Sequence, residues 1–553
     1  MNNDEIEVPR PERLESACRI FVNQAGYQPW DEKYAVLAFP ASFYTVVDEH
    51  GRICFSGATT YGGFDRGSGE VLYKADFSML RLPGKYHVQC GSEFSMNFMI
   101  EDRAYKKCFD KCMKAFYFQR CGCELEQKYA GAWKHGKCHC APALLFDNAR
   151  IRLDVSGGWH DAGDYGRYVT AAATALAHLF YGWKMFPDIF RQQDLNIPEK
   201  PSAMPDVLLE CRYELEWLLK MQRVDGSVWH KVTTFKHAPF VMPEQDEDPM
   251  YVMPISSSAT ADFAAVTALA STIYKEYDPD LSAWLLRCSR AAWDWLEKNP
   301  QFVGFQNPKG CDTGVYGERS DRDNRFWAAA ELFSATGDTS FFSRAMEFLP
   351  EEFSKTALGF ASVGGFGTLA LILSGRMSPQ FGEYLQKTFI NRAEELADIC
   401  RSNTWGVSLT PEQYNWGSNM TVLTNGMTFL IADFLEKRSG GREQRFRRFA
   451  SMQLDYILGT NPTGYSFVTG VGDFCVNYPH HRPAFADGVE ECIPGLVSGG
   501  PNSRREDPYA REMFPDDTPP MKCFSDNMEC YSLNEVTIYW NSPAVFLLAG
   551  LQE

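Results

Sequence analysis

The spacing of hydrophobic and polar residues changes near residue 102. Before that point, short runs of β-branched and aromatic residues alternate with turn residues such as Asp48, Gly51, Pro83 and Gly84. Several short strands at a spacing of about ten residues are typical of a β-sandwich. We therefore predict a polar N-terminal tail over residues 1–17 and a small all-β sandwich over residues 18–101.

After residue 102 the pattern becomes helical. Apolar residues recur at i, i+3 and i+4 in runs such as 169–186, 206–222, 258–277 and 419–438, and this spacing marks one face of a helix. About a dozen such runs, with no strand pattern between them, predict an all-α ring of helical hairpins over residues 103–553. Long loops separate the runs, and loops of that length in a compact domain usually carry function.

Composition and charge narrow the classes of partner. The chain is 45% hydrophobic and 23% charged, which is ordinary for a globular protein, and its formal net charge is −17. Nucleic acids and anionic membranes bind basic patches, so neither is expected as a partner. No apolar run approaches the ~20 residues of a membrane helix. No feature of the sequence predicts an oligomeric state.

The N-terminus and the cysteines bear on the compartment. The first residues, MNNDEIEVPRPERLE, are acidic and polar and lack a secretory signal. The 17 cysteines are odd in number and scattered, which favours reduced thiols over a disulfide framework. We therefore expect a cytoplasmic protein, although a secreted chain whose signal had been removed would begin in the same way.

The string GGWHDAGDYGRY, residues 157–168, carries two close carboxylates, Asp161 and Asp164. Such a pair repels, so each member needs a donor or a shared water. Together they can hold and deprotonate a water or bind a cation. The plainer alternative is that Asp164 caps the helix that follows.

Two further strings lie near the C-terminus. FSDNMECYSLNEVTIYWNS, residues 524–542, contains Asp526 and Glu535, and the helix dipole alone could account for a Glu at this position. The second string, FVTGVGDFCVNYPHHRPAFADG, carries His480 and Arg482 in a proline-containing loop. Either string is weak evidence of chemistry by itself.

Together the three strings resemble family 9 of the glycoside hydrolases, the inverting endoglucanase family. The DAGD motif is matched in full. Phe474 departs from the histidine signature, which prefers Asn, Lys or Arg there. The resemblance covers roughly residues 103–553, and three signatures in the right order are highly specific. The second signature is filled by Phe524, Asp526, Tyr531, Glu535, Thr537, Asn541 and Ser542, and the histidine signature by Ser466, Val468, Thr469, Gly472, Pro479, His480 and Arg482.

The resemblance implies a fold and a set of roles. The fold is an all-α (α/α)6 barrel, and residues 18–101 resemble the immunoglobulin-like domain of one branch of the family. Inversion needs a carboxylic acid on the leaving oxygen and a carboxylate base on a water at the opposite face of the sugar. The resemblance gives the acid role to Glu535 and the base role to Asp164. It implies that Asp161 helps to hold the water, Asp526 orients the site, and His480 and Arg482 bind the sugar.

Aromatic rings can stack on the apolar faces of sugars. Trp159 and Tyr165 flank the two aspartates, Trp327 and Trp416 lie in family-like strings, and Trp540 stands where many relatives carry Tyr. Trp229 is a further candidate, with a buried core residue as the alternative. The predicted substrate-binding residues are therefore Arg482, Trp159, Tyr165, Trp229, Trp327, Trp416 and Trp540.

A Cys/His cluster at residues 120–140 has the spacing of a structural zinc site, and the branch it resembles has a zinc there. The predicted ligands are Cys121, His135, Cys138 and His139, with Cys123 and Cys140 as substitutes; free thiols are the alternative. Calcium also occurs in the family, and the acidic loop 244–249 could supply oxygen ligands, but a solvated loop is the simpler interpretation. No organic cofactor is expected.

We therefore predict inverting hydrolysis of β-1,4-glucosidic bonds in cellulose-type glucans or cello-oligosaccharides. One alternative is an exo-acting cellodextrinase or exo-β-glucosaminidase on imported oligosaccharides, which the absence of a signal favours. An alternative of another class is a catalytically silent sugar-binding protein. The presence of Asp161, Asp164 and Glu535 argues against it, because binding alone would not need all three.

Overall fold

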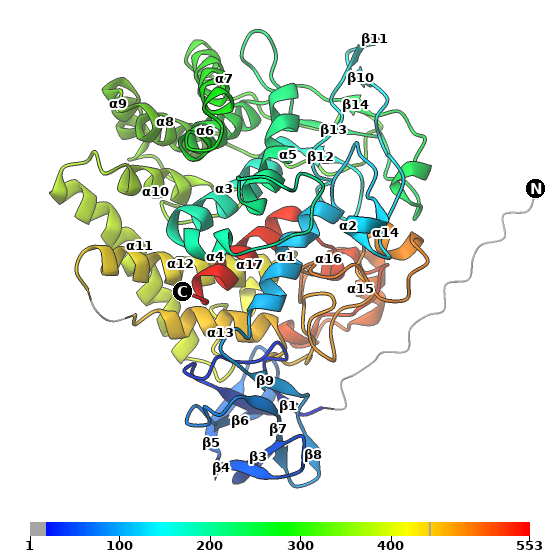
Figure 1. Cartoon of the computed structure of the whole chain (residues 1–553), viewed down its shortest axis with the longest axis vertical. Helices are drawn as coiled ribbons and strands as arrows, with labels where there is room; N and C mark the ends of the chain where they lie inside the picture. Colours follow the sequence, from blue (N-terminus) through cyan, green and yellow to red (C-terminus); the bar gives the residue numbers. More distant parts are fainter. Residues whose placement is uncertain (1–17, 442–443) are drawn as a thin grey trace, which may run out of the picture.

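The computed structural model describes residues 18–441 and 444–553; the predicted tail, 1–17, lies outside the described residues. The N-terminal part is a two-sheet sandwich, drawn in blue at one end of Figure 1. Alternate residues of β7 (Gly84–Cys90), Tyr86 and Val88, point into the core of the sandwich. One sheet has the order β1 (Ile20–Phe21), β2 (Tyr34–Leu37), β6 (Glu70–Asp76), β5 (Thr60–Asp65), and the other β4 (Ile53–Ala58), β3 (Phe43–Asp48), β7 (Gly84–Cys90), β8 (Glu93–Phe94), with β9 (Phe98–Ile100) also on β7.

The sandwich is joined to the helical part by buried polar contacts. Asn23 Nδ2 donates to Asp455 Oδ1 at 2.8 Å, and Gln24 Nε2 donates to the Gly464 carbonyl at 2.8 Å. Gln24 Oε1 also accepts from the backbone N–H of Phe474 at 2.8 Å, and the Phe474 ring stacks on Tyr465. The residue that departs from the histidine signature therefore lies in the contact between the two parts.

Twelve helices in the described part of the chain form an (α/α)6 barrel. Six inner helices are buried on most faces, because they pack against both the barrel core and the outer ring. Contacts run around the barrel from one inner helix to the next: α3 contacts α6, α6 contacts α8, and α8 contacts α10. In the other direction, α3 contacts α17, and α17 contacts α12. The inner helices are α3 (Val169–Met185), α6 (Ser257–Tyr274), α8 (Arg322–Thr336), α10 (Gly364–Ser374), α12 (Ser418–Arg438) and α17 (Ile538–Gly550).

Several outer helices bury one face only, as the i, i+3, i+4 pattern predicts. In α7, for example, the buried residues include Leu281, Leu285, Ala292 and Leu296. No helix within the described ranges is long and apolar enough to cross a bilayer. The outer helices are α1 (Lys106–Phe118), α5 (Asp206–Lys220), α7 (Pro279–Lys298), α9 (Thr339–Phe348), α11 (Pro379–Arg401) and α13 (Arg447–Ile457).

The barrel differs from the sequence prediction in two places. Helix α10 did not stand out in the sequence because glycines open it, and glycine disfavours helix. Packing requires one of them: a Cβ on Gly367 would lie 2.6 Å from the Phe326 ring. The second difference is a small sheet, where no strand was predicted. Its order is β11 (Asn148–Leu153), β10 (Ala143–Leu145), β14 (Tyr251–Val252), β13 (Lys231–Thr233), β12 (Arg167–Tyr168).

Short helical turns complete the long loops between the barrel helices. The turns are α2 (Gln127–Ala130), α4 (Pro187–Arg191), α14 (Arg482–Ala486), α15 (Pro508–Met513), α16 (Tyr531–Asn534) and the 3₁₀ turns η1 (Pro243–Gln245), η2 (Pro411–Gln413) and η3 (Pro520–Lys522). Two of these turns carry residues of the candidate site: α14 begins with Arg482, and α16 begins with Tyr531 and is followed by Glu535.

Candidate active site

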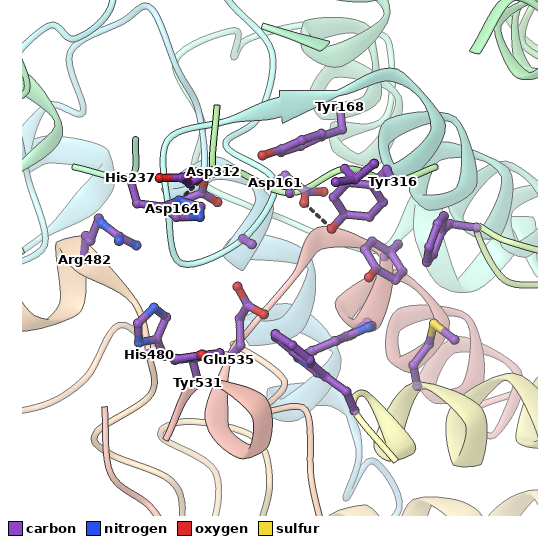
Figure 2. Close-up of a pocket in the computed structure, with 18 residues that line it drawn as sticks. Asp161, Asp164, Tyr168, His237, Asp312, Tyr316, His480, Arg482, Tyr531 and Glu535 are labelled. Atoms are coloured by element: carbon purple, nitrogen blue, oxygen red, sulfur yellow. Dashed lines mark hydrogen bonds and ion pairs between the residues drawn. The ribbon is translucent and has the colours of Figure 1, made fainter. Parts of the chain in front are cut away.

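A cavity of about 740 Å³ opens in the barrel, and four carboxyl groups line it, those of Asp161, Asp164, Asp312 and Glu535. Figure 2 shows Asp161 and Asp164 on one wall and Glu535 reaching toward them from the other. Seven aromatic side chains complete much of the lining, which suits a ligand with apolar faces. They are Tyr168, Tyr316, Phe360, Trp416, Tyr531, Tyr539 and Trp540.

The loop that carries the two aspartates is a tight turn. The Asp161 N–H donates to the Gly166 carbonyl at 2.9 Å, and the Asp161 carbonyl accepts from Ile538 N–H at 2.8 Å. Gly163 is required here, because a Cβ would lie 1.8 Å from the His480 carbonyl oxygen. Helix α3 begins only at Val169, so Asp164 does not cap it. The turn therefore leaves both carboxylates for the cavity.

Asp164 is held in its ionised form. Its Oδ2 lies 3.2 Å from His237 Nδ1 and accepts from Gly166 N–H at 3.3 Å. Burial opposes the charge, but the hydrogen bond and charge of His237, with the charge of Arg482, outweigh it and hold the pKa of Asp164 well below its usual range. An ionised carboxylate of this kind can serve as a base.

Asp161 differs from its neighbour. Burial raises the pKa of Asp161, and the negative charge of Asp164 raises it further, while a hydrogen bond from the Tyr316 hydroxyl partly offsets both. Its Oδ1 is buried without a hydrogen-bond partner in the described part of the chain. That oxygen is available to accept from a water held between the two aspartates.

Glu535 has the opposite electrostatics to Asp164. It follows α16 and precedes Thr537, the N-cap of α17, so the helix-dipole alternative does not explain it. Gly499 N–H donates to its carbonyl at 2.8 Å and fixes the backbone. Burial, together with the charges of Asp164 and Asp161, raises the pKa of Glu535 to about 8. At neutral pH the group is therefore protonated and can donate a proton.

His480 and Arg482 line the same cavity. The Met528 carbonyl can only accept, so the 2.5 Å contact with His480 Nδ1 places a proton on that nitrogen. Burial lowers the pKa of His480 to about 4, which leaves the ring neutral. Arg482 donates from Nε to the Ala238 carbonyl at 2.7 Å and from Nη1 to the Gly163 carbonyl at 2.9 Å.

Asp526 lies outside the cavity lining. Its carboxylate accepts from the backbone N–H groups of Asn477 and Tyr478 at 2.8 and 2.9 Å. It also accepts from Asn534 Nδ2 at 3.0 Å. Asp526 thus ties the loop before His480 to the residue before Glu535, which fits an orienting role and not contact with substrate.

The structure corrects the set of aromatic residues. Trp416 and Trp540 line the cavity, but the other four predicted residues do not. Trp159 donates from Nε1 to the buried Glu210 at 2.9 Å, and Trp327 donates to Glu331 at 3.1 Å. Each is fully buried with its polar atom satisfied, as core aromatics usually are.

Tyr165 and Trp229 also lie outside the cavity. The Tyr165 hydroxyl donates to the Val241 carbonyl, and Trp229 forms a β-bridge with Ile255. Sequence reasoning missed His237, Asp312 and Tyr316, which come from loops without a recognised motif, and did not assign the other lining aromatics. Adjacency to a motif could have suggested Tyr168, Tyr531 and Tyr539.

Four side chains next to the turn that carries Asp161 and Asp164 could hold a metal. Cys121, Cys138, His139 and His160 bring one ligand atom each to within 4.8 Å of one another. Three of the predicted ligands, Cys121, Cys138 and His139, belong to this group. His135 lies outside it, with its Nδ1 turned to the Gly136 carbonyl, and His160 lies in the group instead. His160 precedes Asp161 in the chain, so the group adjoins the turn that carries the two aspartates.

The two substitute cysteines lie outside this group. Cys140 is exposed, and its thiol donates to the Cys138 carbonyl at 3.0 Å. The acidic loop 244–249 does not gather its carboxylates into a site within the residues described. Instead, Asp246 Oδ2 lies 3.2 Å from His139 Nε2.

Comparison with known proteins identifies the family. Residues 105–548 match the model of glycosyl hydrolase family 9, and residues 15–95 match that of the cellulase N-terminal ig-like domain. This chain belongs to glycosyl hydrolase family 9. It is a glycoside hydrolase, and the alternative of a catalytically silent sugar-binding protein is set aside.

Individual family 9 proteins align over nearly the whole chain. A cellodextrinase of Butyrivibrio fibrisolvens is 42% identical over 97% of this chain and 100% of its own length. The structure of a single mutant of a thermostable endoglucanase from Alicyclobacillus acidocaldarius superposes with a TM-score of 0.90, at 34% identity over 97% of this chain and 99% of that one. A Zn-binding triple mutant of a family 9 endoglucanase, J30, superposes with a TM-score of 0.89 at 32% identity, covering 95% and 99% of the two chains.

Proposed function

We propose that this enzyme hydrolyses β-1,4-glucosidic bonds by a single displacement with inversion. The observation that carries the proposal is that the pKa values of two facing carboxyl groups are shifted in opposite directions, upward for Glu535 and downward for Asp164. Glu535 is protonated at neutral pH, and Asp164 is ionised. These are the states that a general acid and a general base require. The same cavity has aromatic rings on which glucose faces can stack.

In this mechanism each wall has one task. Asp164, aided by the free oxygen of Asp161, takes a proton from a water on one face of the sugar. Glu535 gives its proton to the leaving glycosidic oxygen on the other face. Neutral His480 and cationic Arg482 lie beside the cleavage point, where they can hydrogen-bond sugar hydroxyls. No covalent sugar–enzyme bond is needed.

The substrate is proposed to be short cello-oligosaccharides in preference to polymeric cellulose. The support is the cellodextrinase relative, which aligns end to end at 42% identity, against 34% for the thermostable endoglucanase. With cellopentaose, an exo-acting enzyme should release one pair of products from the start, such as glucose and cellotetraose, whereas an endo-acting enzyme should release more than one pair. Chromatography of early products from cellopentaose and from glucosamine oligomers checks this. Equal rates on cello-oligosaccharides and on glucosamine oligomers would contradict the proposal that cello-oligosaccharides are the substrate.

The pH dependence of kcat/KM should follow the ionisation of Glu535 and Asp164. Glu535 must be protonated, so the rate should fall about tenfold per pH unit above about pH 8. Asp164 must be ionised, and its depressed pKa places the acid limb below the usual range of an Asp. His237→Ala should raise that pKa and move the acid limb to higher pH, leaving the alkaline limb in place. An alkaline limb that moved instead would contradict the assignment.

We propose that Cys121, Cys138, His139 and His160 bind one zinc ion. Two thiolates and two imidazoles are a closed, tetrahedral donor set typical of structural zinc. The backbone of His139 takes a φ of 46°, a conformation that residues other than glycine rarely adopt without a functional reason. The ion would hold three separate loops together beneath the aspartate turn and would take no part in the hydrolysis.

The zinc proposal predicts about one ion per chain. Cys138→Ser should lower both zinc content and melting temperature, because the ion orders loops that lack a core of their own. Cys140→Ser, two residues away and outside the group, is the matched control and should change neither. Elemental analysis and thermal unfolding measure the two effects. Wild-type protein prepared without chelator and found free of zinc would overturn the proposal.

A further inference from the structure

One segment connects the catalytic base to the metal-ligand group. It leaves β13 and runs over residues 236–246, which we call the arm. Near its start, His237 Nδ1 lies 3.2 Å from Asp164 Oδ2. At its end, Asp246 Oδ2 lies 3.2 Å from His139 Nε2. Eleven residues thus contact both a catalytic carboxylate and a predicted metal ligand.

The arm has little structure of its own. No helix or strand is formed between residues 234 and 242, so its place is set by side chains that reach it from other elements. Arg482 donates to the Ala238 carbonyl at 2.7 Å, and the Tyr165 hydroxyl donates to the Val241 carbonyl. The side chain of His237 is 42% exposed, so packing alone does not hold it against Asp164.

His139 faces the metal group with one nitrogen and the arm with the other. Its Nδ1 lies 3.3 Å from His160 Nε2, inside the cluster of ligand atoms. Its Nε2 is left for Asp246. Histidines that ligate a metal usually donate their other N–H to a carboxylate, and that contact fixes the orientation of the ring.

We propose that Asp246 is a positioning residue that anchors the arm to the metal site, so that a bound zinc ion keeps His237 against Asp164. The inference rests on the proposed zinc. The ion holds His139 in its left-handed backbone conformation, and His139 in turn holds Asp246. Without the ion, the His139 ring is no longer held by a bond to the metal, and the arm loses its anchor at Asp246.

Zinc release tests the first half of the proposal. Asp246→Asn keeps the size of the side chain and removes its charge, and Glu247→Gln makes the same change on an exposed neighbour without a described contact. With zinc-loaded proteins and a chromogenic chelator, Asp246→Asn should release the ion about 10–100-fold faster than wild type. Glu247→Gln should match wild type. Equal rates for all three proteins would overturn the anchor.

Limited trypsin digestion tests the second half. Lys236 is exposed at the start of the arm, and the next basic residue in the chain after His237 is Lys275. Zinc-loaded wild type should be cut slowly after Lys236, because the arm is held at both ends. Zinc-loaded Asp246→Asn and zinc-free wild type should both be cut there at least about tenfold faster. In zinc-loaded Asp246→Asn, cleavage at sites outside the arm and outside the loops that carry the metal ligands should be unchanged, which a general loss of stability would not produce.

The outcomes separate this inference from the zinc proposal. Zinc content is measured before trypsin is added, so wild type without zinc overturns the zinc proposal and the anchor with it. Wild type that holds zinc but is cut after Lys236 at the same rate with and without the ion overturns the anchor alone. That comparison needs no variant, so it decides the matter even if Asp246→Asn fails to fold.

Discussion

Glu535→Gln lowers kcat on unactivated cello-oligosaccharides by about 10²–10⁴-fold. The amide has the shape of the protonated acid, so binding and fold should be kept, but it has no proton to give to the leaving oxygen. Burial and the facing aspartates keep Glu535 protonated at neutral pH, and this is the state that the substitution removes. Steady-state kinetics and cellobiose binding measure the two effects.

A substrate with a good leaving group separates this role from a structural one. A dinitrophenyl cellobioside needs little protonation to depart, so Glu535→Gln should retain most of its rate on that substrate. Glu529→Gln makes the same change six residues earlier, outside the cavity lining, and should behave as wild type on both substrates. If Glu535→Gln kept a tenth of the wild-type rate on an unactivated glucan, the acid role would have to be given up.

Asp164→Asn abolishes turnover to a similar extent, because the attacking water loses its base. The hydrogen bond from Gly166 can be kept by the amide oxygen, so the turn should survive. Asp154→Asn, on an exposed residue ten positions earlier, is the control and should leave kcat unchanged. Azide needs no base, so adding it should restore part of the rate and yield an α-glycosyl azide from a β-linked substrate.

The anomer released by wild type tests the same role without a variant. A single displacement on a β-linked substrate gives the α-anomer at the new reducing end, before mutarotation mixes the two. Proton NMR in the first minutes of reaction distinguishes them. Early β-anomer would mean that a carboxylate acts as nucleophile, and the roles of Asp161, Asp164 and Glu535 would then have to be reassigned.

These predictions depend on parts of the chain that are far apart in sequence. The Asp164 turn precedes the first inner helix, Glu535 precedes the last, and His237 comes from a loop between them. Contact between α17 and α3 closes the barrel, and this closure brings Glu535 opposite the aspartates. The charge of Asp164 raises the pKa of Glu535, and it can do so because the closed barrel places the two groups in the same cavity.

The sequence by itself determined the family and the helical barrel, and it pointed to Asp161, Asp164 and Glu535, which the structure brings to one cavity. The helical and strand periods report which face of each element is buried, so the barrel helices and the sandwich could be recognised. The DAGD turn and the Glu535 loop could be found because their residues are adjacent in the chain. Local spacing was enough wherever the geometry is local.

Only the tertiary structure decided the residues that meet across long distances. His160 joins the metal group in place of His135, and Trp159 and Trp327 lie in the core while Tyr316 lines the cavity. A sequence pattern shows that an aromatic or a histidine is present, but not which surface its side chain faces once the loops are folded. Ligand sets, stacking surfaces and the arm that contacts Asp164 depend on distances through space, and these were fixed only when the barrel closed.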